Sequence, residues 1–393
     1  MTTERDSAPA PPPARTRPAQ PTILDVAALA GVSKSAVSKV FNNRPGISEP
    51  TRRRIHDAAR KLGWSPSASA TALRGDRTRT VGLVISRAPD LLTTDPYFTE
   101  LIAGMEQELG PLGYGLQLHL IGTDADHEQR LYERLSRERR VDGFVLTESR
   151  LGDARPGLLH RLHMPGLLVG RPWEERPTAP GTVESLHVDG QMEAITAAVD
   201  HLVALGHRSI ASVAGAEDRV HNVLRRRALE EALAGHGLRP HSILTGEFGN
   251  AAAHRATTRL FEGPGPAPTA VLYANDAMAL TGIGTLARRG LRVPEDVSVI
   301  GYDDLPIGVW TYPGLTTISQ DVQLIGRAAA LRLLTVLGEK VAAPPEVPPP
   351  HLVVRESTGP APAGADSPPR PIPPAQAGNT ERETTRASPA PRP

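Results

Sequence analysis

The sequence predicts a small all-α domain followed by a larger α/β domain that is divided into two lobes. Two short helical patterns separated by a glycine lie within residues 22–42. Over residues 80–358, short apolar strand patterns alternate with longer helical patterns, which is typical of parallel sheets covered by helices. Because this second span is longer than a usual domain of about 100–200 residues, we expect it to form two lobes.

The first of these regions is built like a helix-turn-helix. An apolar helix over residues 25–30 stops at Gly31, which can adopt the left-handed conformation that ends a helix. Ser33 can cap a second helix that begins at Lys34. With about 100° of rotation per residue, one sector of this second helix is polar and the opposite sector is apolar. The polar sector consists of Lys34, Ser35, Ser38 and Lys39.

A polar helix face of this kind suits the DNA major groove, although an ordinary helical hairpin with a solvated face would have the same pattern. The next segment favours DNA binding, because Ser48 can cap a third helix that has Pro50 in its first turn. That helix joins an apolar stripe to a basic surface. We therefore expect residues 21–64 to form a DNA-binding headpiece. Its expected DNA contacts are Ser33, Lys34, Ser35, Ser38, Lys39, Asn42 and Arg52.

The larger region contains seven apolar runs that we interpret as short buried strands, with helical patterns between them. The expected strands cover residues 80–86, 115–121, 143–147, 166–169, 210–214, 270–274 and 297–302. The expected helices cover residues 99–109, 127–139, 192–205, 223–236, 252–261 and 276–289. A cleft between two lobes built from such elements is a usual place for a ligand.

Composition limits the function classes. The chain has 393 residues, no cysteine and a net charge of +1, so it has no disulfides or thiolate metal sites and its basic charge is local. No apolar run approaches the ~18 residues of a membrane span, and residues 1–20 lack the apolar core of a signal peptide. We expect these residues and the Pro-rich residues 359–393 to be disordered tails, on a protein located in the cytoplasm with the nucleoid.

Patterns that could indicate an enzyme or a metal site have simpler explanations. Residues 282–287 match the dinucleotide fingerprint GxGxxA, but they lie inside an expected helix and not at a strand-to-helix turn, so they indicate packing. His160 and His163 have helical spacing but no third ligand near them in sequence, which favours a surface role over metal binding. The sequence contains no nucleophile-and-base arrangement. We expect no enzyme activity, no cofactor and no metal.

Taken together, these features resemble the lactose-repressor (LacI/GalR) family of bacterial transcriptional regulators, over roughly residues 22–358. The motifs that carry the resemblance are DVAALAGVSKSAVSKVFN, ISEPTRRRI, LGWSPSASATALR, DPYF, HLVALGHRSIA, AVLYANDAMAL, LRVPEDVSVIGYDD and YPGLTTISQD. The resemblance implies an effector domain like a periplasmic sugar-binding protein, with two lobes joined by three crossovers. We place these crossovers near Leu186, Ser319 and Val341.

The segment between the two domains is rich in small residues. We expect residues 65–79 to form a hinge helix and linker, in which Leu73 is the one large aliphatic side chain of the small-residue stretch. By the resemblance, this hinge folds on DNA and Leu73 enters the minor groove as a wedge.

Effector contacts are expected where strands end at the cleft between the lobes. They are Phe98, Arg171, Arg225, Asp276, Trp310 and Gln320. The resemblance contributes Phe98, Arg171, Asp276 and Gln320, which match positions that commonly touch effector in the family. Thr196 is a departure, because family members often have an effector-binding arginine at this position. Asp189 or Gln191 can substitute for it.

We interpret the chain as a homodimeric repressor that binds double-stranded DNA at a palindromic operator and responds to a small molecule, for which we expect a sugar. Repression is the usual mode of the family. A corepressor-dependent regulator of the purine type is the main alternative. A sugar-binding transport protein is a further alternative, but it would have a signal peptide and no basic headpiece. Because the tail lacks the apolar spacing of a coiled coil, we expect the lobes to form the dimer.

Overall fold

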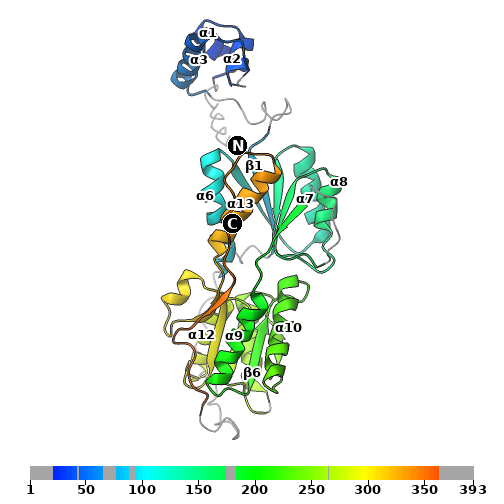
Figure 1. Cartoon of the computed structure of the whole chain (residues 1–393), viewed down its shortest axis with the longest axis vertical. Coiled ribbons are helices and arrows are strands. Elements are labelled where there is room, and N and C mark those ends of the chain that lie inside the picture. Colours follow the sequence, from blue (N-terminus) through cyan, green and yellow to red (C-terminus); the bar gives the residue numbers. More distant parts are fainter. Residues whose placement is uncertain are drawn as a thin grey trace, which may run out of the picture. The chain divides into compact units, whose positions relative to one another are not determined.

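The structure is a computed structural model that describes residues 21–41, 44–64, 77–87, 94–173, 183–263 and 265–362 (Figure 1). The chain divides into two compact units, Met1–Thr78 and Arg79–Pro393. The expected N-terminal arm, most of the expected hinge and nearly all of the expected tail lie outside the described residues. Asn42 and Leu73 lie outside them as well.

The smaller unit is a three-helix domain. Its helices are α1 (Ile23–Ala30), α2 (Lys34–Phe41) and α3 (Glu49–Leu62). Gly31 has a φ of 63° and ends α1, while the Ser33 hydroxyl accepts a hydrogen bond from a backbone amide in the first turn of α2. Val26, Val37 and Ile55, one from each helix, are fully buried and form the centre of the core.

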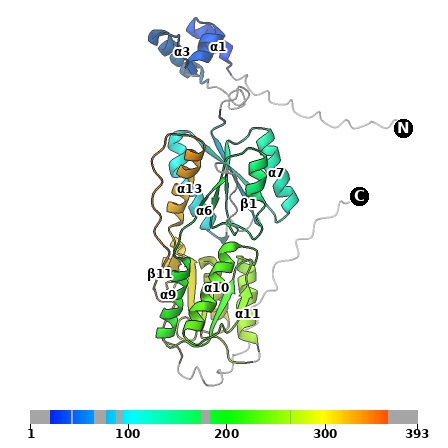
Figure 2. The ribbon, with the colours of Figure 1, turned by 45° about the vertical axis from the view of Figure 1, so that its right-hand side comes forward.

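The first lobe of the larger unit is a parallel sheet with the strand order β2-β1-β3-β4-β5. Its strands are β1 (Thr80–Ser86), β2 (Gly115–Ile121), β3 (Gly143–Leu146), β4 (Gly166–Val169) and β5 (Val183–Leu186). Its helices are α6 (Tyr97–Leu109), η1 (Gly110–Leu112), α7 (Ala125–Arg137), α8 (Arg155–Arg161) and α13 (Val322–Val336). Alternate strand residues point to opposite faces, so Leu83 packs under α6 and α13 whereas Val84 packs under α7 and α8. Figure 2 shows α6 and α13 on one side of β1 and α7 on the other.

The second lobe is a sheet with the strand order β11-β10-β9-β8-β6-β7, in which β11 alone runs antiparallel to its neighbour. Its strands are β6 (Ile210–Ala214), β7 (Ile243–Thr245), β8 (Ala270–Tyr273), β9 (Ser298–Asp303), β10 (Thr316–Ser319) and β11 (His351–Val353). Its helices are α9 (Gln191–Ala204), α10 (Val220–Gly235), α11 (Asn250–Glu262), α12 (Asp276–Arg288) and η2 (Pro306–Val309). One apolar core joins α9 and α10 to the sheet, and a second core joins α11 and α12 to its other face.

The chain passes between the lobes three times, at residues 187–190, 320–321 and 337–350. We expected these crossovers near Leu186, Ser319 and Val341. The first and third crossovers touch each other at Gly190. This residue has a φ of 97°, and a Cβ atom on it would lie 2.8 Å from the Cβ of Pro349. Only glycine fits both the backbone conformation and the space at this position.

The expected strands and helices are all present in the structure, which also contains further elements. Most of these are short, but α13 is a long and largely apolar helix. The sequence analysis missed four strands (Val183–Leu186, Ile243–Thr245, Thr316–Ser319 and His351–Val353) and the helices α8 and α13. The expected disordered tail, residues 359–393, begins too early in the sequence analysis. Gly359 accepts a hydrogen bond from the buried His207 side chain, and the Ala361 amide donates to the Leu205 carbonyl at 2.8 Å. The packed chain therefore continues past Thr358.

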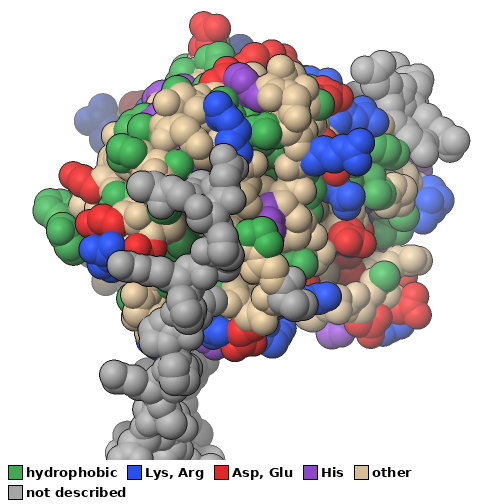
Figure 3. Space-filling view, turned by 90° about the horizontal axis from the view of Figure 1, so that it is seen from below, with side chains coloured by type: hydrophobic (Ala, Val, Ile, Leu, Met, Phe, Trp, Pro, Cys, Tyr) green, Lys and Arg blue, Asp and Glu red, His purple; other side chains and the backbone are tan. Residues whose placement is uncertain are grey.

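The GxGxxA match lies within α12, as the sequence analysis expected of a packing motif. A Cβ atom on Gly282 would collide with the Tyr273 ring, whereas Gly284 has open space beside it. Among the helices that the structure describes, none is both long and apolar enough to cross a membrane. Seen from below, the surface carries basic, acidic and hydrophobic side chains intermixed (Figure 3), in keeping with the small net charge.

Candidate functional site

The first candidate site is the polar face of α2. Lys34, Ser35 and Lys39 are exposed, and Ser38 is half-buried. The Ser33 and Ser35 hydroxyl oxygens lie 2.9 Å apart at the start of the helix. The structure thus keeps together, on one short helix, the cations and hydroxyls that the sequence analysis expected to contact DNA.

Arg52 has a different environment from these residues. It lies on α3, and its guanidinium donates to the Val40 carbonyl at the end of α2 over 3.5 Å. Its Nε atom lies 3.8 Å from a Glu49 carboxylate oxygen. Arg52 therefore links two helices of the headpiece, and its positive charge lies at the C-terminal end of α2, where cations are favourable.

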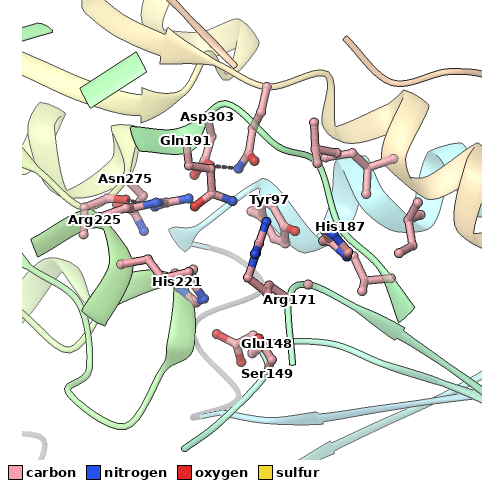
Figure 4. A pocket seen from close by; sticks show the side chains of 18 of the residues that line it. Tyr97, Glu148, Ser149, Arg171, His187, Gln191, His221, Arg225, Asn275 and Asp303 are labelled. Carbon is pink, nitrogen blue, oxygen red and sulfur yellow. Dashed lines mark hydrogen bonds between the residues drawn. The ribbon is translucent and has the colours of Figure 1, made fainter. Parts of the chain in front are cut away.

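The second candidate site is a cavity of about 410 Å³ between the lobes of the larger unit, a size usual for small-molecule sites. It lies where parallel strands of both sheets end. Side chains that follow such strands gather at one edge of a sheet, and here they form the walls of the cavity. Figure 4 shows the polar side chains that point into it from both lobes and from the crossovers. They include Tyr97, Glu148, Ser149, Arg171, His187, Gln191, His221, Arg225, Asn275 and Asp303.

Four of the six expected effector contacts line this cavity: Phe98, Arg171, Arg225 and Gln320. Arg171 pairs with Asp189 at 2.5 Å, and the Gln320 amide donates to Asp303 at 2.5 Å. The Arg225 guanidinium stacks 3.3 Å from the centre of the Tyr302 ring and donates to the Ala274 carbonyl at 3.1 Å.

Asp276 does not line the cavity, so the structure does not support the expected effector contact. Its side chain is fully buried. One carboxylate oxygen accepts the Leu305 amide at 2.7 Å, and the other accepts the Thr317 hydroxyl at 2.6 Å. Asp276 holds the loop after β9 to strand β10. Its backbone follows the end of β8, as expected for a cavity residue. The first turn of α12, however, directs its side chain into the sheet.

Trp310 is also not in the cavity. It follows η2 and is 83% exposed, and the neighbouring Tyr312 is 97% exposed. The loop that carries them leaves the edge of the cavity and presents both rings to the surface of the lobe. The expected effector contact for Trp310 is therefore not supported.

Asn275 both caps α12 and lines the cavity. Its side-chain oxygen accepts the Met278 amide at 2.8 Å, and its side-chain nitrogen donates to Asp95 of the other lobe at 3.0 Å. Asp303 is the carboxylate that reaches the cavity from β9. Its φ of 107° is rare for a residue with a side chain and marks a strained position of the kind that occurs at functional sites.

The pKa values of Asp95, His221 and Asp303 in the cavity are shifted toward the neutral forms of these groups. Burial raises the pKa of Asp95 to about 6, and the nearby Glu148 adds to the effect. Burial also raises the pKa of Asp303 well above its usual value, although Arg225 opposes the shift. Burial and then Arg225 lower the pKa of His221. Such groups can donate and accept hydrogen bonds, which suits a ligand rich in hydroxyls.

Thr196 takes no part in the cavity. Its hydroxyl donates to the Met192 carbonyl within α9 at 2.9 Å. Both expected substitutes, Asp189 and Gln191, line the cavity. Asp189 pairs with Arg171, whereas the buried side-chain oxygen of Gln191 has no hydrogen-bond partner in the structure. Among the described residues, no group of three or more His, Cys, Asp or Glu side chains could hold a metal ion.

Comparisons with known proteins agree with this architecture. A model described as bacterial regulatory proteins, lacI family, matches residues 22–67, and a periplasmic binding protein-like domain matches residues 199–358. The chain is 35% identical over 324 residues to the HTH-type transcriptional repressor PurR of Aliivibrio fischeri strain MJ11, which covers 81% of this chain and 92% of PurR. The chain belongs to the lacI family of bacterial regulatory proteins. It is a DNA-binding transcriptional regulator.

Other members are similar to this lacI-family regulator over most of their length. The HTH-type transcriptional regulator CelR of Thermobifida fusca is 33% identical over 341 residues, covering 86% of this chain and 98% of CelR. A solved complex of CelR with cellobiose has a TM-score of 0.63 at 32% identity, over 86% of this chain and 99% of that one. A lac repressor dimer bound to operator and the anti-inducer ONPF has a TM-score of 0.73 at 27% identity, over 87% of this chain and all of that one.

The buried carboxyl of Asp276 generates a prediction about stability. Burial raises its pKa to about 7, above the value of 3.8 expected when unfolded, so its stabilising contribution is full below pH 3.8 and is lost as the pH rises through 7. Asp276→Ala leaves the Leu305 amide and the Thr317 hydroxyl unpaired, and we expect a loss of about 2–4 kcal/mol. Asp276→Asn can accept from the Leu305 amide through its oxygen, and its amide nitrogen can donate to the Thr317 hydroxyl oxygen. The stability of this variant relative to the unaltered protein should rise from pH 5 to pH 8.

Urea unfolding of both variants and of the unaltered protein at the two pH values measures these differences in the free energy of unfolding. A normal unfolding curve for Asp276→Ala, together with loss of an effector response, would instead support the original assignment of Asp276 to the effector site.

Proposed function

We propose that this regulator is a repressor that binds a palindromic operator as a homodimer and is controlled by a small molecule in the interlobe cavity, with a sugar as the expected class. The cavity carries the proposal for the effector, because it combines aromatic side chains with carboxyls, an amide and arginine. Such groups bind hydroxyl-rich ligands. The CelR complex with cellobiose supports the same class. As an operator-binding repressor, the protein would act in the cytoplasm, at the nucleoid.

A purine-type effector is the second candidate, since PurR is among the similar repressors. Phe98 and Phe248 offer rings at the cavity on which a flat base could stack. Arg225 and Asp303 could serve either ligand. The two candidates differ in the ligand that stabilises the protein, and this can be measured directly.

We propose that α2 enters the major groove and that Lys34, Ser35 and Lys39 face base edges, with Ser33 and Ser38 near phosphates. The lac repressor dimer bound to operator supports such a role for the headpiece. Leu73 and Asn42 stay predictions, as a minor-groove wedge and a further DNA contact.

Lys34 provides the test of the DNA-binding proposal. Its exposed ammonium group can contact base edges, so Lys34→Ala should cost about 1–3 kcal/mol on the true operator. Binding to operator and scrambled duplexes across a salt series measures the loss. Lys61→Ala is the matched control, because this exposed lysine at the end of α3 should affect both duplexes equally. Equal weakening of both duplexes by Lys34→Ala would mean that α2 is not the recognition helix.

The effector proposal is tested by thermal shift against sugars and nucleobases, because a bound ligand raises the melting temperature. We expect a sugar to stabilise the protein and Asp303→Asn to weaken its binding at least tenfold. Asparagine tolerates the left-handed backbone at this position, so this variant should fold. Calorimetry on both proteins gives the affinities. Stabilisation by nucleobases and not by sugars would make the purine type correct.

The exposed apolar loop generates a prediction about the dimer. Ile307, Val309, Trp310 and Tyr312 form an apolar patch on the second lobe, and we propose that this patch is part of the dimer surface, because exposed apolar patches mark interfaces. Trp310→Ser should weaken the dimer by about 2 kcal/mol or more, whereas Trp173→Ser on the first lobe should not.

Sedimentation across a dilution series gives the dimer constants. A chain that ends at Pro362 should behave like the full chain. Dissociation after this truncation, with no effect of Trp310→Ser, would place the interface in the tail.

A further inference from the structure

The two lobes are joined at a place that includes none of the three crossovers. The loop after β3 pairs with the loop before α10 through two backbone hydrogen bonds. The Leu151 amide donates to the Asp218 carbonyl at 2.9 Å, and the Val220 amide donates to the Ser149 carbonyl at 3.0 Å. The residues between them form an isolated antiparallel bridge. Sequence-distant loops of different lobes thus share a short piece of β-ladder.

A carboxylate lies beside this bridge and faces cations from both lobes. Both oxygens of Glu148 accept hydrogen bonds from Nε of Arg87 at 2.9 Å, and one of them lies 4.0 Å from Nε of Arg219 in the second lobe. All three side chains are about nine-tenths buried. Solvent and salt screen such a group much less than they screen surface pairs.

Arg87 extends the contact toward the far wall of the cavity. Although it follows β1 in the first lobe, its guanidinium donates to the Glu247 carbonyl of the second lobe at 3.3 Å. Its central carbon lies 4.5 Å from the centre of the Phe248 ring, within the range of a cation–π interaction. One arginine therefore binds Glu148 in its own lobe and two successive residues in the other.

Contacts within the first lobe fix the conformation of the loop that carries Glu148. Glu148 has a φ of 54°, a left-handed conformation that costs about 1–2 kcal/mol for a residue with a side chain. The buried Arg155 donates to the carbonyls of Thr147 and Glu148 at 3.0 and 3.2 Å. Glu128 binds the Arg150 guanidinium at 2.6 and 3.0 Å. Strain that neighbouring groups hold in place in this way is typical of functional positions.

We propose that Glu148 is the positioning residue of an interlobe clasp, formed by Arg87, residues 148–151 and residues 218–220, that holds the two lobes closed on the cavity. Buried ion pairs add little net stability, but they can specify one arrangement of the groups around them. The clasp therefore sets the closed arrangement of lobes that are each stable by their own cores. This inference rests on the proposed function for its consequence, which is that an effector acts by shifting the equilibrium between clasped and open lobes.

Hydrogen exchange tests the clasp without knowledge of the effector. The Leu151 and Val220 amides report its state, because their hydrogen bonds cross between the lobes. Glu148→Gln removes the carboxylate that pairs with Arg87 and leaves Arg219 with only its exposed partner Asp218. Arg219→Met removes the cation on the second lobe. We expect both variants to speed exchange of these two amides at least tenfold, with the amides of β1 and β8 unchanged.

Glu108→Gln is the matched control, because Glu108 pairs with Arg327 at 2.7 Å inside the first lobe. It should leave both reporter amides protected. Faster exchange throughout the first lobe in Glu148→Gln would overturn the proposal and make Glu148 a residue of the lobe's own fold. Full exposure of both reporter amides in the unaltered protein would overturn it as well.

Operator binding by the unaltered full-length protein is measured alongside. Failure to bind any operator would contradict the proposed function, whereas the amide exchange would still report whether the clasp exists. The two inferences can therefore fail separately.

Discussion

Parallel strand direction is the constraint on which the larger unit depends. In each lobe, parallel strands bring their carboxyl ends to one edge of the sheet, and residues that follow strands of both sheets line one cavity. The side chains that meet there are far apart in sequence and are polar, because the loops after strands need no apolar packing. Recognition groups and lobe-to-lobe contacts are therefore concentrated in the same narrow zone.

This concentration makes the zone electrostatically unusual. Asp95, Glu148 and Asp303 lie close together with Arg87 and Arg225, and most of these groups are sheltered from solvent. Some charges are cancelled by ion pairs, and others are suppressed by shifts toward the neutral form. An incoming molecule therefore meets hydrogen-bonding groups as well as charges, so the positions of its own donors and acceptors contribute to its selection.

The sequence predicted local features well, because the signals are local. A glycine with a left-handed backbone and a serine cap define the headpiece turn, and both are readable from a few adjacent residues. Strand-end position also identified Arg171 as a cavity residue, and the family resemblance identified Gln320. It failed for Asp276, because neighbouring residues on the first turn of α12 point in different directions: Asn275 faces the cavity and Asp276 faces the sheet.

Long-range features could not be read in this way. The pairing of Arg87 with Glu148 and Phe248 joins three loops, and nothing near any one of them identifies its partners. The course of the loop around Trp310 depends on hydrogen bonds from the Leu305 amide to the Asp276 side chain and from the Leu315 amide to the Gly308 carbonyl. The short strands β7 and β11 owe their pairing to longer neighbours, since three residues hold too little periodicity to identify them.

The contact between Gly190 and Pro349 has a mechanical meaning. Two of the three connections between the lobes touch at a point where no side chain fits, so they cannot slide past each other freely. A turning motion of one lobe on the other would pivot close to this point, where displacement is smallest. Atoms on the far rim of each lobe would then travel furthest. A small change in the angle between the lobes, caused by a ligand near the pivot, would therefore produce a large displacement at the rim.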